Sequence, residues 1–231
     1  MATSLGQRAR AFVSRHRWSL SLVAVSTFCF VRLAGEMREG DMDALDRMAE
    51  QVVDRWRGGV DVPMLALTTF GDVGGMSALA LAITLTLVFL RKRREAVYFV
   101  LSSAGALLMN LLLKAAFHRA RPDPELVYRI PQPVSFSFPS GHSMGSAAVL
   151  SSAVVLLFVL KIPPAIRVVA ATIAIVVWAG VALSRVYFGA HFPSDVVDGA
   201  LAATAWVSAV TGWMYPRALP GEHTVTPAPP M

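Results

Sequence analysis

The sequence predicts an all-α integral membrane protein, a bundle of six transmembrane helices with both termini in the cytoplasm. The 231-residue chain is 55% hydrophobic and only 16% charged, and its mean hydropathy is +0.55. These values are too apolar for an ordinary soluble domain of this length. The basic residues lie mostly between long apolar runs, a distribution typical of membrane proteins whose loops set their orientation.

A transmembrane helix needs roughly 20 mostly apolar residues, because the hydrocarbon layer is about 30 Å thick and each residue adds about 1.5 Å. Six runs approach that length, at residues 18–35, 73–90, 96–113, 143–160, 168–184 and 199–216. The last five contain no charged residue, whereas the first contains Arg32 near its far end. The runs lack polar alternation, which favours helices over the strands of a barrel. No internal repeat or second domain is evident.

The first run has an alternative interpretation as a cleaved signal peptide, since a basic stretch precedes it. Arg32 stands where a small-residue cleavage site would be expected, and this favours a retained helix. We therefore expect a basic cytoplasmic segment at residues 1–17 and a membrane domain at 18–216. A disordered, proline-rich cytoplasmic tail is expected at 217–231.

The short loops predict the orientation, because cytoplasmic loops are enriched in Lys and Arg. Residues 1–17 carry four arginines and no acid, residues 91–95 have four basic residues and one acid, and residues 161–167 have two basic residues and no acid. All three segments fall on the side predicted to be cytoplasmic. The segment 36–61, with eight acids against four arginines, falls on the other side, and the sequence does not indicate its role. The net charge of +6 is therefore a topology signal, not a nucleic-acid-binding stripe.

Two outer segments hold most of the remaining polar chemistry. The first is basic, with Lys114 and Arg121 among its cations, although the topology rule disfavours positive charge on that side. An anionic ligand would explain this charge, and a loop that contacts lipid headgroups is the alternative. The same segment ends in Ser140, Gly141 and His142 directly before an apolar helix. Free N–H groups at a helix start bind anions, although plain helix capping also explains a Ser-Gly pair there.

The second outer segment contains Arg185, His191 and Asp195. The planar guanidinium of Arg185 can hold two phosphate oxygens, and a neutral imidazole of His191 can act as a nucleophile. Asp195 lies four residues beyond His191, within reach of its other ring nitrogen, where it would fix the tautomer. Helix capping is the alternative for the His191–Asp195 pair alone, but three anion-suited elements on one side favour a phosphate site. Cys29 is the single cysteine, so no internal disulfide forms.

The order and spacing of these residues resemble the three-part signature of the type-2 phosphatidic acid phosphatase superfamily, which includes the vanadium haloperoxidases. The three parts are Lys114, six residues and Arg121-Pro122; Pro139-Ser140-Gly141-His142; and Ser184-Arg185, five residues, His191, three residues and Asp195. Each part alone is a modest signal, but the joint spacing is specific. His118 and Arg119 match no fixed position of the signature and are not expected to be catalytic.

The resemblance implies a role for each matching position. The groups that would bind phosphate oxygens are Lys114, Arg121, Ser140, Gly141 and Arg185. His191 would attack phosphorus and form a phosphohistidine, Asp195 would orient it, and His142 would act as general acid and then as general base. No cofactor is implied. The few carboxylates near the motifs show no pattern for a two-metal site, so we expect no metal.

The implied function is that of a lipid-phosphate phosphohydrolase acting at the extracytoplasmic face of a bacterial plasma membrane. Polyprenyl diphosphate such as undecaprenyl diphosphate, phosphatidate and phosphatidylglycerophosphate are all candidate substrates, and the sequence does not choose among them. A phosphotransferase using the same phosphohistidine is one alternative. A non-catalytic lipid-binding or transport protein is another, although it would need no nucleophile. The uncharged spans disfavour a soluble haloperoxidase, and the oligomeric state is not predicted.

Overall fold

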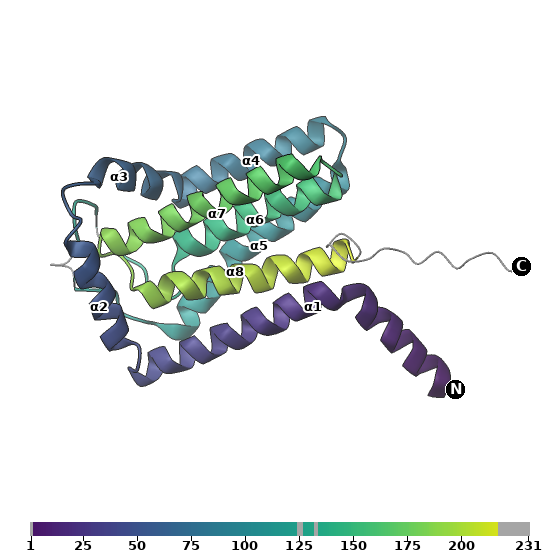
Figure 1. The fold of residues 1–231 in the computed structure, drawn as a ribbon, viewed down its shortest axis with the longest axis horizontal. Coiled ribbons are helices and arrows are strands. Elements are labelled where there is room, and N and C mark those ends of the chain that lie inside the picture. Colours follow the sequence, from purple (N-terminus) through teal and green to yellow (C-terminus); the bar gives the residue numbers. More distant parts are fainter. Residues whose placement is uncertain (1, 124–126, 132–133, 217–231) are drawn as a thin grey trace, which may run out of the picture.

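The computed structural model describes residues 2–123, 127–131 and 134–216, with side chains from His16 onward, and every regular element in this part of the chain is an α-helix (Figure 1). The all-α prediction is therefore confirmed there, while the expected tail at 217–231 lies outside the described residues. The helices, in chain order, are α1 (Ala2–Glu39), α2 (Asp43–Asp54), α3 (Asp61–Phe70), α4 (Val73–Phe89), α5 (Arg93–Phe117), α6 (Gly141–Val159), α7 (Pro164–Tyr187) and α8 (Pro193–Met214).

Helix α6 lies at the centre of the bundle, packed against α5, α7 and α8, while α1 lies along α8. Small residues permit this close packing, since a buried layer between α5, α6 and α8 is formed by Ala106, Met144, Ala148 and Ala203. Gly105 has the same effect, because a Cβ there would meet the indole of Trp206 at 2.4 Å. These contacts let the helix backbones approach closely without a bulky side chain between them.

Four helices have the length and composition needed to cross a membrane: α1 over His16–Glu39, α5, α6 and α7. Helices α3 and α4 pass the same test only as a pair, with a bend of 54° between them. Helix α8 has 22 residues but is not among these candidates, and its first turns carry Asp195 and Asp198. The protein is an integral membrane protein, and the full count of six spans remains a prediction.

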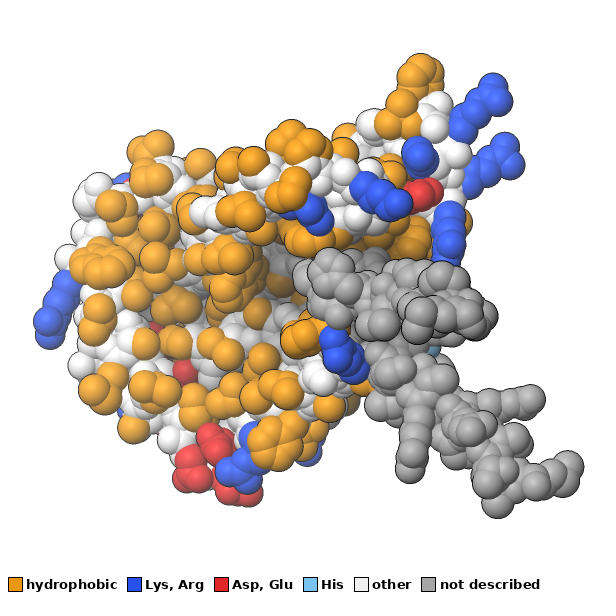
Figure 2. Space-filling model, turned by 45° about the vertical axis from the view of Figure 1, so that its right-hand side comes forward, with side chains coloured by type: hydrophobic (Ala, Val, Ile, Leu, Met, Phe, Trp, Pro, Cys, Tyr) orange, Lys and Arg blue, Asp and Glu red, His pale blue; other side chains and the backbone are white. Residues whose placement is uncertain are grey.

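The outer surface of the long helices is apolar, as a lipid-facing surface must be. Large exposed side chains include Phe28 on α1, Phe89 on α4, Leu112 on α5 and Val168 on α7. Figure 2 shows hydrophobic side chains spread over the visible face, with many Lys and Arg side chains toward its upper right. The basic stretch at residues 91–94 between α4 and α5 is fully on the surface.

The acidic segment 36–61 is not a single loop, because α1 extends to Glu39, α2 occupies Asp43–Asp54 and α3 begins at Asp61. Helix α2 buries Asp46 and Val53 on one face and leaves most other side chains exposed, so its helical form depends on docking against the bundle. The bend between α3 and α4 lies at Gly71 and Asp72, where the Asp72 side chain accepts a hydrogen bond from the N–H of Gly75 at 2.6 Å.

Four of the long helices each have one end at the same end of the bundle. Because consecutive helices run in opposite directions, the end of α5, the start of α6, the end of α7 and the start of α8 meet at one end of the bundle (Figure 1). Helix α2 lies across this end, in contact with α7 and α8. The start of α1 and the end of α8 lie at the opposite end.

Candidate active site

The eight residues predicted for the site come from the helix ends and connections at the end of the bundle that α2 crosses. Lys114 lies in the last turn of α5, Ser140 caps α6, and Gly141 and His142 form its first turn. Arg185 lies in the last turn of α7, and His191 occupies the short connection to α8. The two remaining residues are Asp195, in the first turn of α8, and Arg121, in the segment after α5.

His191 lies between Arg121 and Asp195. The Nη1 atom of Arg121 is 3.1 Å from His191 Nε2 and donates a second hydrogen bond to the Ala190 carbonyl oxygen at 2.6 Å. Because a guanidinium has only donors, Nε2 must be the unprotonated acceptor and Nδ1 must carry the proton. Nδ1 faces Asp195 Oδ2 at 3.4 Å. The contacts therefore select the tautomer in which Nε2 offers a lone pair.

Burial keeps this imidazole uncharged. The His191 side chain is 2% exposed, and burial lowers its pKa to about 4, although the hydrogen bond and the charge of Asp195 act in the opposite direction. Arg121 and Arg185 lower the pKa of His191 further by charge repulsion. Neutral His191 is therefore the dominant form at pH 7, as a nucleophile requires.

The Asp195 carboxylate is fixed from several directions. Its Oδ2 accepts hydrogen bonds from the Ser137 hydroxyl and from the N–H of Phe192 at 3.0 Å, and its Oδ1 accepts one from Arg119 Nη1 at 2.6 Å. The two carboxylates of Asp195 and Asp46 raise the pKa of Arg119 above its ordinary value, against the lowering effect of burial. Asp195 is thus held as an anion beside His191 Nδ1.

Three cations lie near the imidazoles and are not paired with an acid. Within the described residues, Lys114, Arg121 and Arg185 form no ion pair, and the Nε of Arg185 is buried without a hydrogen-bond partner. Arg185 is 3% exposed, and its Nη1 donates to the hydroxyl of Thr68. Lys114 donates to the carbonyl oxygens of Phe136 and Ser137. A buried guanidinium with an unused donor, together with two further unpaired cations, forms a site suited to an anion.

The start of α6 adds neutral donors to this cationic site. The N–H of Gly141 has no intrahelical acceptor, because it lies in the first turn, and the helix dipole is positive there. Asn110 supports the turn by donating to the Pro139 carbonyl oxygen at 3.2 Å. Arg185, Arg121 and Lys114 lie close enough for their charges to act on His142 as well, so both imidazoles face one cationic site.

Three residues of the site were missed or set aside on the sequence: Arg119, Asp46 and Ser137. Arg119 and Asp46 form an ion pair at 2.9 Å, and Ser137 donates to Asp195. Arg119 gave one usable signal, a second arginine two residues before Arg121 in an outer loop. Asp46 gave none, because eight acids in its segment look alike until one of them is buried.

Two carboxylates at this end are paired with protein groups. Asp195 and Asp46 share Arg119, and no cluster of three or more His, Cys, Asp or Glu side chains suited to a metal occurs in the described part of the chain. Asp198 lies one turn beyond Asp195 in α8, and its two carboxylate oxygens are buried without a hydrogen-bond partner there. We find no role for Asp198 in the site chemistry.

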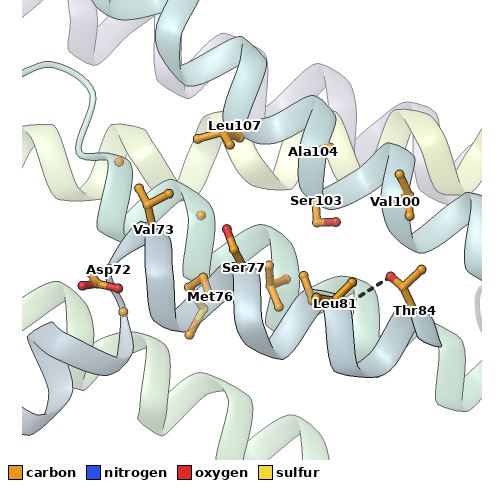
Figure 3. A pocket seen from close by; sticks show the side chains of 15 residues that line it. Asp72, Val73, Met76, Ser77, Leu81, Thr84, Val100, Ser103, Ala104 and Leu107 are labelled. Atoms are coloured by element: carbon orange, nitrogen blue, oxygen red, sulfur yellow. Dashed lines mark hydrogen bonds between the residues drawn. The ribbon is translucent and has the colours of Figure 1, made fainter. Parts of the chain in front are cut away.

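A groove of about 290 Å³ runs between α4, α5 and α6, beginning beside Gly141. Figure 3 shows its labelled side chains, with Val73, Met76 and Leu81 on α4 and Val100 and Leu107 on α5. Its lining is mainly apolar. Because eleven helical residues separate Val73 from Thr84 of the lining, the groove extends roughly 16 Å into the apolar part of the bundle.

Comparison with known proteins gives consistent relatives. The family model described as the PAP2 superfamily matches residues 95–218. Phosphatidylglycerophosphatase B of Bacillus subtilis (strain 168) is 32% identical over 165 residues, which cover 68% of this chain and 75% of that protein. Lipid A 1-phosphatase of Rhizobium etli is 37% identical over 177 residues, 65% of this chain and 69% of that protein.

For another relative, the match covers most of that protein's length. Decaprenylphosphoryl-5-phosphoribose phosphatase of Mycobacterium tuberculosis (strain ATCC 25618 / H37Rv) is 30% identical over 179 residues, 74% of this chain and 90% of that protein. Among solved structures, a transmembrane PAP2-type phosphatidylglycerolphosphate phosphatase from Bacillus subtilis matches with a TM-score of 0.75 and 27% identity. That match covers 83% of this chain and 94% of the other.

Proposed function

Since the chain belongs to the PAP2 superfamily and is a membrane phosphatase of the phosphoric ester hydrolase class, we propose that it hydrolyses a lipid phosphate at the extracytoplasmic face through a phosphohistidine at His191. One observation carries this proposal. Three cations without an acid partner in the described residues surround two imidazoles, and the Nε donor of the buried Arg185 is unused. A phosphoryl group supplies the missing negative charge and acceptors.

In the first step, Lys114, Arg121, Arg185 and the N–H of Gly141 bind the phosphoryl oxygens. Phosphate displaces the Arg121 contact with His191 Nε2, and the freed lone pair attacks phosphorus. The charge that spreads over the equatorial oxygens meets fixed cations and N–H donors, which stabilise the transition state. Asp195 accepts the Nδ1–H and stabilises the positive charge that develops on the ring.

His142 completes the cycle from the opposite side of the phosphorus. It donates a proton to the leaving oxygen as the P–O bond breaks, so that the lipid product leaves protonated. It then takes a proton from water, which attacks the phosphohistidine, breaks the P–N bond and releases inorganic phosphate. Such exchange of acid and base roles between two half-reactions follows from microscopic reversibility. Ser140 contributes as the cap that fixes the first turn of α6, accepting from the N–H of Ser143 at 3.4 Å.

The groove between α4, α5 and α6 supports a lipid substrate. An apolar chain lying there would place its phosphate near Gly141, at the level of the site. Leu81 and Leu107 of its lining are partly exposed on the outer surface, so a chain can enter sideways from the bilayer. The face is inferred from charge, because the basic residues 91–94 lie at the other end of the bundle from the site.

The relatives support a lipid phosphate or diphosphate as the substrate class. Their names specify phosphatidylglycerophosphate, the 1-phosphate of lipid A and decaprenylphosphoryl-5-phosphoribose, and a further relative from Sulfolobus acidocaldarius is an undecaprenyl-diphosphatase. These molecules share a phosphoryl group and a long apolar chain, and differ in the polar part. We therefore propose the shared chemistry as the substrate class of this chain.

The test is phosphate release by purified protein in detergent from a panel of lipid phosphates and diphosphates at equal surface concentration, with a short-chain soluble phosphate as control. We expect the lipid substrates to be preferred and His191→Ala to lose at least about 1,000-fold in kcat, the scale for a covalent nucleophile. Normal melting of the variant would show that its fold is intact. Full activity of His191→Ala would refute the nucleophile, and absence of phosphate release from every lipid would refute the substrate class.

A further inference from the structure

Asp46 lies on α2 in the acidic segment 36–61, and its side chain is only 1% exposed. Its Oδ1 accepts a hydrogen bond from the N–H of Ser194 at 3.0 Å. Its Oδ2 accepts from the Ser194 hydroxyl at 2.7 Å and from Arg119 Nη2 at 2.9 Å. A buried carboxylate is costly unless it is paired, and every partner of Asp46 is adjacent to or in contact with Asp195.

Arg119 connects the two buried carboxylates. Its Nη2 contacts Asp46, while its Nη1 donates to Asp195 Oδ1 at 2.6 Å and to the Ser194 hydroxyl at 2.8 Å. Because the guanidinium is rigid and planar, holding one of its nitrogens at Asp46 fixes the direction of the other toward Asp195. The ring of Phe192 covers the guanidinium, with 4.1 Å between the Arg119 Cζ and the ring centroid.

We propose that Asp46 is a positioning residue for phosphoryl transfer, acting through Arg119 and Ser194 to hold the Asp195 carboxylate where it orients His191. This inference rests on the proposed nucleophilic role of His191. It gives the acidic segment 36–61 a part in the reaction, because α2 supplies the outermost member of a chain of contacts that ends at the nucleophile.

The negative charge of Asp46 supports this role, in addition to its effect on the orientation of Arg119. One guanidinium between two carboxylates leaves a net negative charge behind the imidazole, and the ring of His191 gains positive charge as Nε2 bonds to phosphorus. In a buried site this charge stabilises the transition state more than the ground state, in which the ring is neutral. Without the Asp46 charge, Arg119 would pair with Asp195 alone and neutralise the carboxylate on which His191 depends.

A purely structural role for Asp46 makes a different prediction. If Asp46 only fastens α2 to the bundle, its loss lowers stability and changes binding of all ligands alike. If it acts on His191, its loss weakens ligands that bond to Nε2 and spares those that only fill the phosphate site. Vanadate belongs to the first kind, because it forms a five-coordinate adduct with an imidazole that resembles the transition state. Inorganic phosphate belongs to the second kind.

The experiment compares Asp46→Asn with Asp43→Asn, which removes the same charge from an exposed position on the same helix. For Asp46→Asn we expect kcat to fall roughly 10- to 100-fold, the range for groups that orient a functional histidine through hydrogen bonds, with KM changed less than about threefold. Inhibition by vanadate should weaken by a similar factor, and inhibition by phosphate should change less than about threefold. Asp43→Asn should match the unmodified protein in all four quantities.

Ser194→Ala provides a milder change in case Asp46→Asn does not fold, since it removes one hydroxyl from the same network. We expect a roughly two- to tenfold loss of kcat with the same separation of vanadate from phosphate, on the scale of one ordinary hydrogen bond. Unchanged kcat in the folded variants, or equal weakening of both inhibitors, would overturn the proposal. If His191→Ala itself retained activity, the proposed function would fail first, which is a separate result.

Discussion

Replacing Gly199 by Ala would place a methyl group where α8 meets the turn that opens α6. A Cβ on Gly199 lies 2.8 Å from the Ser140 carbonyl oxygen and 3.2 Å from the backbone nitrogen of Met144. Both neighbours are backbone atoms, so no flexible side chain can turn away. The added methyl therefore has to separate α8 from the start of α6.

The size of this separation follows from the geometry. Ordinary contact begins at 3.4 Å, so the Ser140 carbonyl must move by about 0.6 Å. The N–H of Ser140 donates to the Asp195 carbonyl oxygen at 2.9 Å, so the movement changes the position of the phosphate-binding turn relative to His191. A misplacement of 1 Å costs about 100-fold in rate, so we expect kcat to fall roughly tenfold. Overpacking lowers the free energy of unfolding by about 1–3 kcal/mol, and the higher helix propensity of Ala raises it by about 0.5–1 kcal/mol.

The assay is phosphate release together with thermal unfolding in detergent. Gly35→Ala is the matched control, because Gly35 also lies within a helix, a Cβ there has no atom within 4 Å, and Gly35 does not line the groove. We expect the control to keep kcat within about twofold and its melting temperature unchanged or slightly raised. Full activity of Gly199→Ala with normal stability would show that the turn at Ser140 does not need its present position, and would refute the argument.

Two further predictions concern conditions. Burial lowers the pKa of His191 to about 4 from an ordinary value of 6.5. Between these pH values the unfolded chain therefore binds more protons than the folded protein. The stability that this group contributes is present above pH 6.5 and is lost as the pH falls toward 4. The melting temperature of the unmodified protein should fall over this window more steeply than that of His191→Gln, and equal slopes would contradict the assignment. Activity should persist in EDTA, because Lys114, Arg121 and Arg185 provide the positive charge; loss of activity that added magnesium restores would overturn the metal-free mechanism.

The sequence indicated the long helices because their signal is local. An apolar run of sufficient length needs no partner to be recognised, so residues 96–113, 143–160 and 168–184 all lie within helices of the structure except the last residue of the second run, which follows its helix. The observed helix boundaries differ from those of the apolar runs where polar residues extend a helix. Helix α5, for example, begins at Arg93 and carries Lys114 in its last turn. The motif spacing also predicted which residues lie together, because the three parts of the motif fall at helix ends that meet at one end of the bundle.

Only the tertiary structure shows which residue of the acidic segment 36–61 is buried and which side chains it contacts. Asp46 is 73 residues from Arg119 and 148 residues from Ser194, and contacts over such separations leave no periodic trace in the sequence. The tautomer of His191 depends in the same way on Arg121 and Asp195 meeting opposite nitrogens of its ring. Hydrophobic length and helix caps are properties of neighbouring residues, whereas burial and pairing of charges arise only when distant helix ends are brought together.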